Sequence, residues 1–252
     1  MEAKDRIICA LDVDNAFRAL QLVEMLRDHV GVFKVGLELI SAAGTGIVEK
    51  LQDAGADRIF YDAKLHDIPN TVAGAMRGIA RLGVWSVTVH CAGGPDMLRA
   101  AVDAACSAAA DGTFMAPKVL AVTVLTSLGA EMLKTDLQVS MPLEAYVPFL
   151  ATRAYEAGCA GVIASPLEVA GVRAAVPDPD FLIVTPGVRP AGSDWGDQAR
   201  VMTPGEAIGS GADYLVIGRS IVAAADPVGA VQRIAAEIAA AQRTPAEIEQ
   251  AR

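Results

Sequence analysis

Three charged side chains alternate in sign within six residues, at Asp62, Lys64 and Asp67. They follow the apolar run Ile59-Phe60-Tyr61, which reads as a strand buried on both faces, so mutual pairing must offset a costly desolvation. Two carboxylates flanking an ammonium group keep it protonated, able to donate a proton or to stabilise a developing negative charge. The same residues could instead form a structural ion pair that closes the strand, because structural networks perturb titration as well.

Other polar residues stand in or just after apolar runs that read as strands. Lys34 lies inside Val32-Phe33-Lys34-Val35, where an inward-pointing ammonium needs a partner. Asp12 follows the first run, although with Asp14 it could form a helix-capping turn. Further polar side chains in such places are His90, Thr126, Ser127 and Ser165.

Two Gly and Arg pairs follow the last two predicted strands, at Gly187 with Arg189 and at Gly218 with Arg219. Glycine allows a ligand to approach the backbone closely, and arginine adds a permanent positive charge. In eight-stranded α/β barrels the phosphate site commonly forms after strands seven and eight. These residues therefore predict a phosphate monoester as the ligand.

His90 stands next to Cys91, a pairing that could suggest a metal site. No second histidine lies at ligand spacing, so the expectation is a hydrogen-bonded core histidine and no metal. His66, between Lys64 and Asp67, is expected to orient the backbone and is not the first choice as a base.

Short apolar runs alternate with longer amphipathic segments along the whole chain, and this alternation must position the polar residues. Eight βα units predict an α/β fold, a single (β/α)8 TIM barrel with its active site at the C-terminal ends of the strands. The predicted strands are Ile7 to Leu11, Val32 to Val35, Arg58 to Tyr61, Ser86 to His90, Val119 to Leu125, Gly161 to Ala164, Phe181 to Val184 and Tyr214 to Ile217. The predicted helices are Ala16 to Arg27, Val72 to Leu82, Pro95 to Ala109, Tyr146 to Ala157, Pro204 to Gly211 and Pro227 to Gln242.

Gly55, Gly158 and Gly211 precede strands in similar short turns, where glycine is expected to supply a left-handed helix end. The longest connection, Ser127 to Glu144, has room for a short helix and is where an excursion over the site is expected. We expect one catalytic domain over residues 1–243 and a polar tail over 244–252.

The chain has 252 residues, of which 53% are apolar and only 5% aromatic, typical of parallel strands packed between alanine-rich helices. A formal charge of −9 argues against nonspecific binding to nucleic acid or to an anionic membrane. The charged N-terminus and the lack of a long apolar stretch predict neither signal peptide nor membrane span. Cys9, Cys91, Cys106 and Cys159 are widely spaced, which predicts reduced, buried thiols and a cytoplasmic protein.

Ten consecutive residues of the chain resemble the signature of a known family. The segment Asp62 to Thr71 resembles the signature Asp-x-Lys-x-x-Asp-Ile-Pro-Asn-Thr of the orotidine 5′-phosphate decarboxylase family. The similarity spans nearly the whole chain. Further matching segments, in the expected order, are Ala10-Leu11-Asp12, Phe33-Lys34-Val35-Gly36, Val122 to Ser127, Thr185-Pro186-Gly187-Val188-Arg189, Gly196-Asp197-Gln198 and Ile217-Gly218-Arg219.

The resemblance implies conversion of orotidylate to uridylate in pyrimidine synthesis without a cofactor. It implies that Lys64 delivers the proton to C6 of the pyrimidine within a network of Lys34, Asp62, Lys64 and Asp67. Asp67 and Thr71 would reach across a twofold homodimer into the partner's site. The remaining substrate contacts that it implies are Asp12 and Lys34 at the ribose, Thr126 at the pyrimidine edge, Gln198, Gly218 and Arg219 at the phosphate with Arg189 nearby, and Ile68, Pro69, Asn70 and Pro186.

Two other functions fit parts of the pattern. A metal-dependent sugar-phosphate decarboxylase or aldolase can share the Asp-x-Lys-x-x-Asp core, but its magnesium needs additional carboxylates, for which Glu38 is the candidate. A catalytically silent barrel could bind nucleotide phosphate as a sensor. Retention of all four charges argues against this second alternative, because unused buried charges cost stability.

Overall fold

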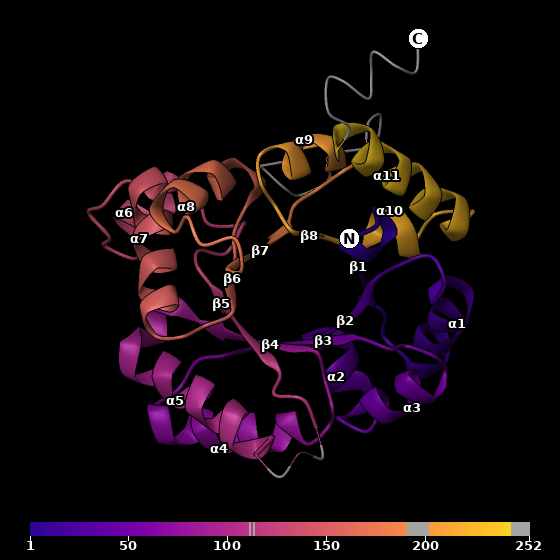
Figure 1. Ribbon diagram of the computed structural model, residues 1–252, viewed down its shortest axis with the longest axis horizontal. Helices are drawn as coiled ribbons and strands as arrows, with labels where there is room; N and C mark the ends of the chain where they lie inside the picture. Colours follow the sequence, from indigo (N-terminus) through magenta and orange to yellow (C-terminus); the bar gives the residue numbers. More distant parts are fainter. Residues whose placement is uncertain (111, 113, 191–201, 243–252) are drawn as a thin grey trace.

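The computed structural model describes residues 1–110, 112, 114–190 and 202–242. Eight parallel strands form a closed barrel in chain order, and β8 pairs with β1 to complete the ring (Figure 1). Helices surround the strands on the outside, which confirms the predicted TIM barrel. The strands are β1 (Ile7–Ala10), β2 (Val32–Gly36), β3 (Ile59–Leu65), β4 (Ser86–His90), β5 (Lys118–Val122), β6 (Gly161–Ile163), β7 (Leu182–Pro186) and β8 (Tyr214–Ile217).

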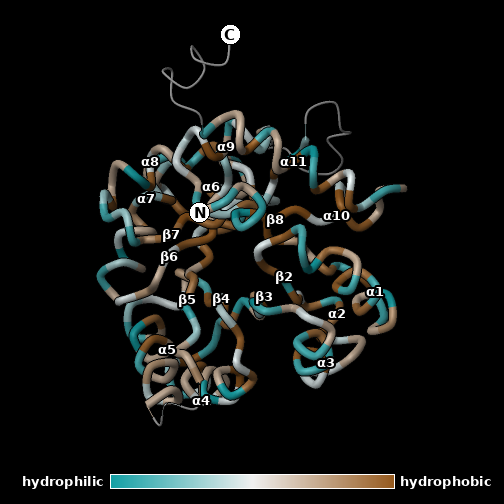
Figure 2. Tube along the Cα trace, turned by 45° about the vertical axis from the view of Figure 1, so that its right-hand side comes forward, coloured by the Kyte–Doolittle hydropathy of each residue, from teal (hydrophilic) through white to brown (hydrophobic). Residues whose placement is uncertain are grey.

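The strands are buried on both sides, as their continuous apolar sequences require. Residues that alternate along each strand point into the barrel, where they form a core separate from the larger one beneath the helices. Figure 2 shows apolar stretches along β5, β7 and β8, whereas the helices alternate between apolar and polar segments. The buried residues of the inner core are Ile8, Val32, Phe60, Leu120, Val184 and Tyr214.

Each predicted helix is present, with ends shifted by a few residues. Four α-helices are unpredicted: α2, α3 and α8 have seven residues each, and α10 has four. Helices this short are marginal alone and depend on tertiary packing, so sequence periodicity reveals them poorly. The α-helices are α1 (Ala16–Leu26), α2 (Leu37–Ala43), α3 (Ile47–Asp53), α4 (Pro69–Ala80), α5 (Gly94–Ala108), α6 (Ala130–Thr135), α7 (Leu143–Glu156), α8 (Val169–Ala175), α9 (Pro204–Gly209), α10 (Arg219–Val222) and α11 (Pro227–Gln242).

Most strand ends lie within two residues of the prediction, and the C-terminal ends of β3 and β5 differ by more. β3 continues to Leu65 instead of ending at Tyr61, because its backbone bulges and then pairs with β4 again. β5 ends at Val122 and not at Leu125, since the amide and the hydroxyl of Thr123 both bond to the carbonyl of Ile163 at the end of β6. The first change keeps charged residues inside the sheet, and the second places Thr126 in the turn that follows β5.

The predicted left-handed turns are confirmed. The φ angles of Gly55, Gly158 and Gly211 are 99°, 85° and 107°, a region that glycine enters without steric cost. Each of these turns brings the chain from a helix to the start of the next strand. The long connection from Ser127 to Glu144 contains the short helix α6.

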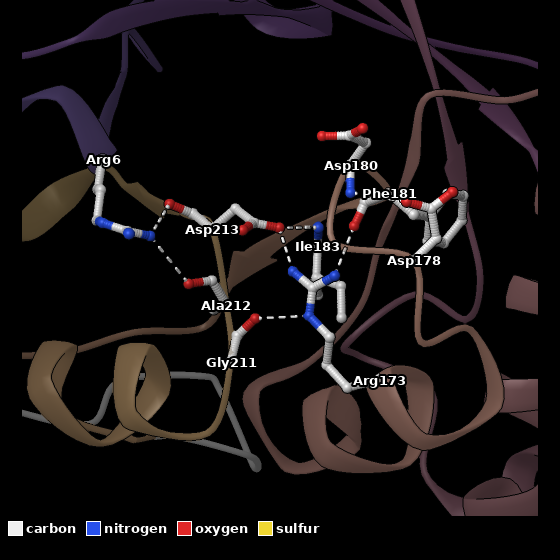
Figure 3. Close-up of polar contacts among 9 residues, drawn as sticks. All are labelled: Arg6, Arg173, Asp178, Asp180, Phe181, Ile183, Gly211, Ala212 and Asp213. Carbon is white, nitrogen blue, oxygen red and sulfur yellow. Dashed lines mark hydrogen bonds and ion pairs between the residues drawn. The ribbon is translucent and has the colours of Figure 1, made fainter. Parts of the chain in front are cut away.

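Arg173 of α8 ties the N-terminal ends of β7 and β8 together (Figure 3). Its guanidinium donates to the carbonyl oxygens of Phe181 at 2.6 Å and Gly211 at 3.0 Å, and it pairs with the carboxylate of Asp213. That carboxylate also accepts from the amide of Ile183 at 2.7 Å. The cluster lies at the end of the barrel opposite to the one where the predicted site residues gather.

Three of the four cysteines are buried, and Cys106 corrects the prediction because it lies exposed on α5. Burial raises the pKa of Cys9 and of Cys159 to about 12, and it raises the pKa of Cys91 as well. These three thiols are therefore protonated at neutral pH and unreactive. Among the described helices, none combines the length and the apolar composition needed to cross a membrane.

Candidate active site

A cavity of about 270 Å³ opens at the C-terminal ends of the strands. Its wall includes side chains from β1, β2, β3, β5, β6, β7 and β8 or from the turns that follow them. Loops at this end form the active sites of such barrels. Of the residues predicted for the site, those that line the cavity are Asp12, Lys34, Asp62, Lys64, Thr126, Pro186, Arg189, Gly218 and Arg219.

A bulge in β3 determines where Asp62 and Lys64 lie. Tyr61 pairs with Val87 of β4, and the next paired residues are Leu65 and Val89. Between these two pairs β3 advances by four residues and β4 by only two. Bulges of this kind redirect side chains beside active sites. Within the bulge Lys64 has a φ of 49°, a left-handed conformation that side chains other than glycine rarely adopt.

Four side chains form a charge network at the base of the cavity: Asp12, Lys34, Asp62 and Lys64. Lys64 Nζ donates to Asp62 Oδ2 at 2.8 Å, and Lys34 Nζ lies 3.5 Å from the same oxygen. Lys34 Nζ also donates to Asp12 Oδ1 at 2.9 Å. Lys34 therefore has the acidic partners that its position inside the barrel requires. Asp12 pairs with Lys34 and does not cap the following helix. The N-cap of α1 is Asn15.

Thr88 of β4, which is absent from the predicted site residues, completes the network. Its hydroxyl donates to Asp62 Oδ1 at 2.8 Å and accepts from the backbone amide of Lys64 at 2.9 Å. Its position two residues before His90 places both side chains on the inner face of the barrel, because side chains alternate along a strand. The alternation of side chains along β4, applied from His90, would have identified Thr88 as a residue of the inner face.

The surroundings of Asp62 keep it ionised. Burial by itself would raise the pKa of Asp62, but the ammonium groups of Lys34 and Lys64 and the hydrogen bonds from Lys64 and Thr88 outweigh it. The pKa of Asp62 consequently lies below its usual value. The pair of Asp62 and Lys64 can thus present a carboxylate and a proton donor side by side at neutral pH.

The part of the cavity wall that follows β7 and β8 carries the arginines. Arg189 follows β7 and is buried, and its backbone amide donates to the carbonyl of Met202 at 3.0 Å. Arg219 begins α10 directly after Gly218 and is exposed. A side chain added at Gly218 would place its Cβ 3.3 Å from Asp12 Oδ2, so this wall is tight around the backbone. Gln198, also predicted for the phosphate, lies outside the described residues.

Residues 67–71 do not line the cavity of their own chain. All five are exposed where the chain leaves β3 and enters α4, and Asp67 Oδ1 accepts from the amide of Ile68 at 2.6 Å. Asp67 is thus separate from the charge network. The substrate contacts predicted for this segment remain predictions and would need a second protomer: Asp67, Ile68, Pro69, Asn70 and Thr71.

His90 lies half-buried beside His66, with ring centroids 5.3 Å apart. Burial, the neighbouring His66 and the ammonium of Lys64 hold the pKa of His90 below its usual value, so its ring is neutral at pH 7. Cys91 next to it is directed away, and its thiol faces the carbonyl of Leu150. Glu38, the extra carboxylate considered for magnesium, is exposed in the first turn of α2 and is not part of the cavity wall.

The chain is similar to known proteins over most of its length. Residues 5–234 match the model of the orotidine 5′-phosphate decarboxylase / HUMPS family. The orotidine 5′-phosphate decarboxylase of Moorella thermoacetica is 53% identical over 238 residues, 94% of each chain, and that of Paramagnetospirillum magneticum is 50% identical over 92% of this chain and 97% of its own. The crystal structure of orotidine 5′-phosphate decarboxylase from Lactobacillus acidophilus superimposes with a TM-score of 0.80 at 39% identity, covering 92% of this chain and 98% of its own. With the family model matched over nearly the whole chain, this protein belongs to the orotidine 5′-phosphate decarboxylase / HUMPS family.

Proposed function

We propose that this chain converts orotidine 5′-phosphate to uridine 5′-phosphate and carbon dioxide, as a step of pyrimidine nucleotide synthesis, without a cofactor. The observation that carries the proposal is the contact of 2.8 Å between Lys64 Nζ and Asp62 Oδ2 in the wall of the cavity. It places a proton donor and a carboxylate together in a cavity whose wall also carries Arg189 and Arg219. An acidic nucleotide with a reactive carboxylate suits both parts of this cavity.

The proposed chemistry needs one proton donor and a stabilised negative charge. When the bond between C6 and the carboxylate breaks, its electron pair stays on C6 and carbon dioxide leaves. The ammonium of Lys64 stabilises this pair electrostatically and then transfers a proton to C6, after which Lys64 regains a proton from solvent. Asp62 holds this ammonium in place, and Lys34 pairs with the same carboxylate oxygen.

Ground-state repulsion is a smaller part of the proposed mechanism. Asp62 lies where the substrate carboxylate would approach Lys64, and the like charges repel each other until carbon dioxide leaves. Because catalysis by ground-state destabilisation is contested, we rank it below stabilisation of the transition state. At the other end, binding of the phosphate by Gly218 and Arg219 supplies energy that orients the pyrimidine. Lys34 and Asp12 are the proposed ribose contacts, and Thr126 and Pro186 complete the wall.

We also propose a homodimer with shared active sites. Residues 67–71 are exposed and absent from the cavity wall of their own chain, and the apolar Ile68 among them is 67% exposed. If these signature residues contact the substrate, the cavity that they reach belongs to another chain. A twofold partner would bring Asp67 and Thr71 to the other chain's cavity, where Asp67 adds the second carboxylate beside Lys64. The free, buried thiols favour a cytoplasmic enzyme.

The ultraviolet absorbance of orotidylate, followed with and without EDTA, tests the proposed reaction. We expect loss of the substrate absorbance at the same rate in both conditions. Loss that EDTA abolishes would overturn the cofactor-free reaction, and no loss in either condition, with protein shown to be folded and dimeric, would favour a sugar-phosphate enzyme or a silent binder. Tight binding of uridylate without turnover would identify a silent binding protein instead.

Lys64→Ala tests the proton donor. We expect kcat to fall by roughly 10³-fold or more while the affinity for uridylate changes by less than about tenfold, because the phosphate contacts remain. Lys50→Ala, which removes an exposed lysine of α3, is the control and should leave kcat unchanged. Near-normal turnover by Lys64→Ala would rule out Lys64 as the donor.

A further inference from the structure

Thr88 lies at the one point where β4 meets the bulge of β3. Its side chain is completely buried on the inner face of the barrel, between the paired residues Val87 and Val89 that flank the bulge on β4. The two strands are paired on either side of this point but not across it. The bulge is therefore without the regular ladder of hydrogen bonds where Lys64 leaves the strand.

A single hydroxyl holds both functional residues of the bulge. The amide of Lys64 can only donate, so the Thr88 oxygen accepts that hydrogen bond at 2.9 Å. The one hydroxyl proton is then free to be donated to Asp62 Oδ1 at 2.8 Å. Asp62 Oδ2, the other carboxylate oxygen, receives Lys64 Nζ. Backbone and side chain of Lys64 are thus connected to the same carboxylate by two routes, one of which passes through Thr88.

The backbone of Lys64 needs such a partner. With a φ of 49° it has an unfavourable conformation for a residue with a side chain, and this persists only where the surroundings enforce it. The bulge leaves the amide of Lys64 without a backbone acceptor on β4, and the Thr88 hydroxyl takes that place. If the hydroxyl were lost, the amide would have no acceptor there. The bulge could then relax toward an ordinary conformation, which would move the ammonium relative to the substrate.

We propose that Thr88 is a positioning residue for the decarboxylation, because its hydroxyl fixes the backbone of Lys64 and the carboxylate of Asp62 at once. This inference rests on the proposed function for its kinetic effect, but its structural part does not. Thr88 does not line the cavity, so it acts through Lys64 and Asp62 and not on the substrate.

Thr88→Val, nearly equal in shape, tests the proposal because it replaces only the hydroxyl, with a methyl group. We expect kcat to fall on the order of 10²-fold, the effect of a small misplacement of a catalytic group, while KM changes less than about threefold. Thr185→Val is the matched control. Thr185 is equally buried on β7, and its hydroxyl has no hydrogen-bond partner among the described residues, so its loss should leave kcat unchanged.

A second pair of variants separates the hydroxyl from the packing of the methyl group. Thr88→Ser and Thr88→Ala both lack the methyl, and only serine retains the hydroxyl, so serine should keep kcat within about fivefold and alanine should not. Wild-type kcat in Thr88→Val would overturn the proposal. If Thr88→Val does not fold, equal activity of the serine and alanine variants would overturn it as well.

Hydrogen exchange at the amide of Lys64 distinguishes failure of this inference from failure of the proposed function. The amide should be protected in the wild type and in Thr88→Ser and should exchange faster in Thr88→Val or Thr88→Ala. Wild-type protein that leaves orotidylate unchanged would refute the proposed function alone. Unchanged exchange at Lys64 in all variants would refute the role of Thr88, whatever the activity.

Discussion

Asp62 keeps its negative charge in a place where burial opposes it. Two ammonium groups and two hydrogen bonds compensate, and the pKa of Asp62 is lowered in the folded protein. A carboxyl group whose pKa is lower when folded stabilises the fold at pH values above its unfolded pKa, about 3.9, and this contribution is lost as the pH falls through the folded pKa. Asp62 is therefore both a proposed catalytic residue and a source of acid sensitivity.

The pH dependence of unfolding tests this at the same residue. We compare the free energy of unfolding of the wild type with that of Asp62→Asn, which cannot titrate, by urea denaturation from pH 7 to pH 3. The difference between the two proteins should be constant above about pH 5 and should shift in favour of Asp62→Asn as the pH falls below about 4. A difference that stays constant to pH 3 would show that the pKa of Asp62 is not lowered by folding.

At the scale of elements, the short helix α8 depends on Arg173, which connects it to the starts of β7 and β8 (Figure 3). Three acceptors would each lose a hydrogen bond in Arg173→Ala: two backbone carbonyls and the carboxylate of Asp213, which would keep only the amide of Ile183. We expect the free energy of unfolding to fall by about 2–3 kcal/mol, because these groups are partly buried and Asp213 would be left without its cation.

An exposed arginine provides the control for this substitution. Arg153 of α7 pairs with Glu156 at 2.7 Å, but both side chains are about half exposed. Arg153→Ala should therefore change the free energy of unfolding by about 0.5 kcal/mol or less. Both variants are measured by urea denaturation at one protein concentration, and equal losses would mean that the contacts of Arg173 do not stabilise the barrel.

At the scale of the whole molecule, the proposed homodimer predicts that two inactive variants restore each other. In a mixed dimer of Lys64→Ala and Asp67→Ala, one site carries both substitutions and the other carries neither, if Asp67 serves the partner's site. Random assembly makes half of the dimers mixed, so an equal mixture should recover about a quarter of the wild-type activity.

The control mixture combines Lys64→Ala with Asp62→Ala. Both residues lie in the same chain's network, so each site of a mixed dimer retains one substitution and activity should not recover. The rate of orotidylate loss is measured after the mixtures are unfolded and refolded together. Recovery in neither mixture would place Asp67 outside the partner's site.

Sequence by itself determined the barrel and most of the cavity wall. Buried parallel strands must be continuous apolar runs, so eight such runs between helices could be counted, and any polar residue at their ends stood out. For the same reason Asp12, Lys34, Asp62, Lys64 and Arg219 could be assigned to one end of the barrel before their distances were known. The signature from Asp62 to Thr71 then indicated the family.

Only the tertiary structure decided how β3 and β4 pair. The bulge, the left-handed backbone of Lys64 and the role of Thr88 arise from hydrogen bonds between residues 24 and 26 positions apart. Hydropathy reports whether a residue is buried, but not which residue on the neighbouring strand it opposes. A buried threonine in Ser86 to His90 therefore looked like any other strand residue. The register between the two strands, a property of the closed barrel, gave its hydroxyl two partners.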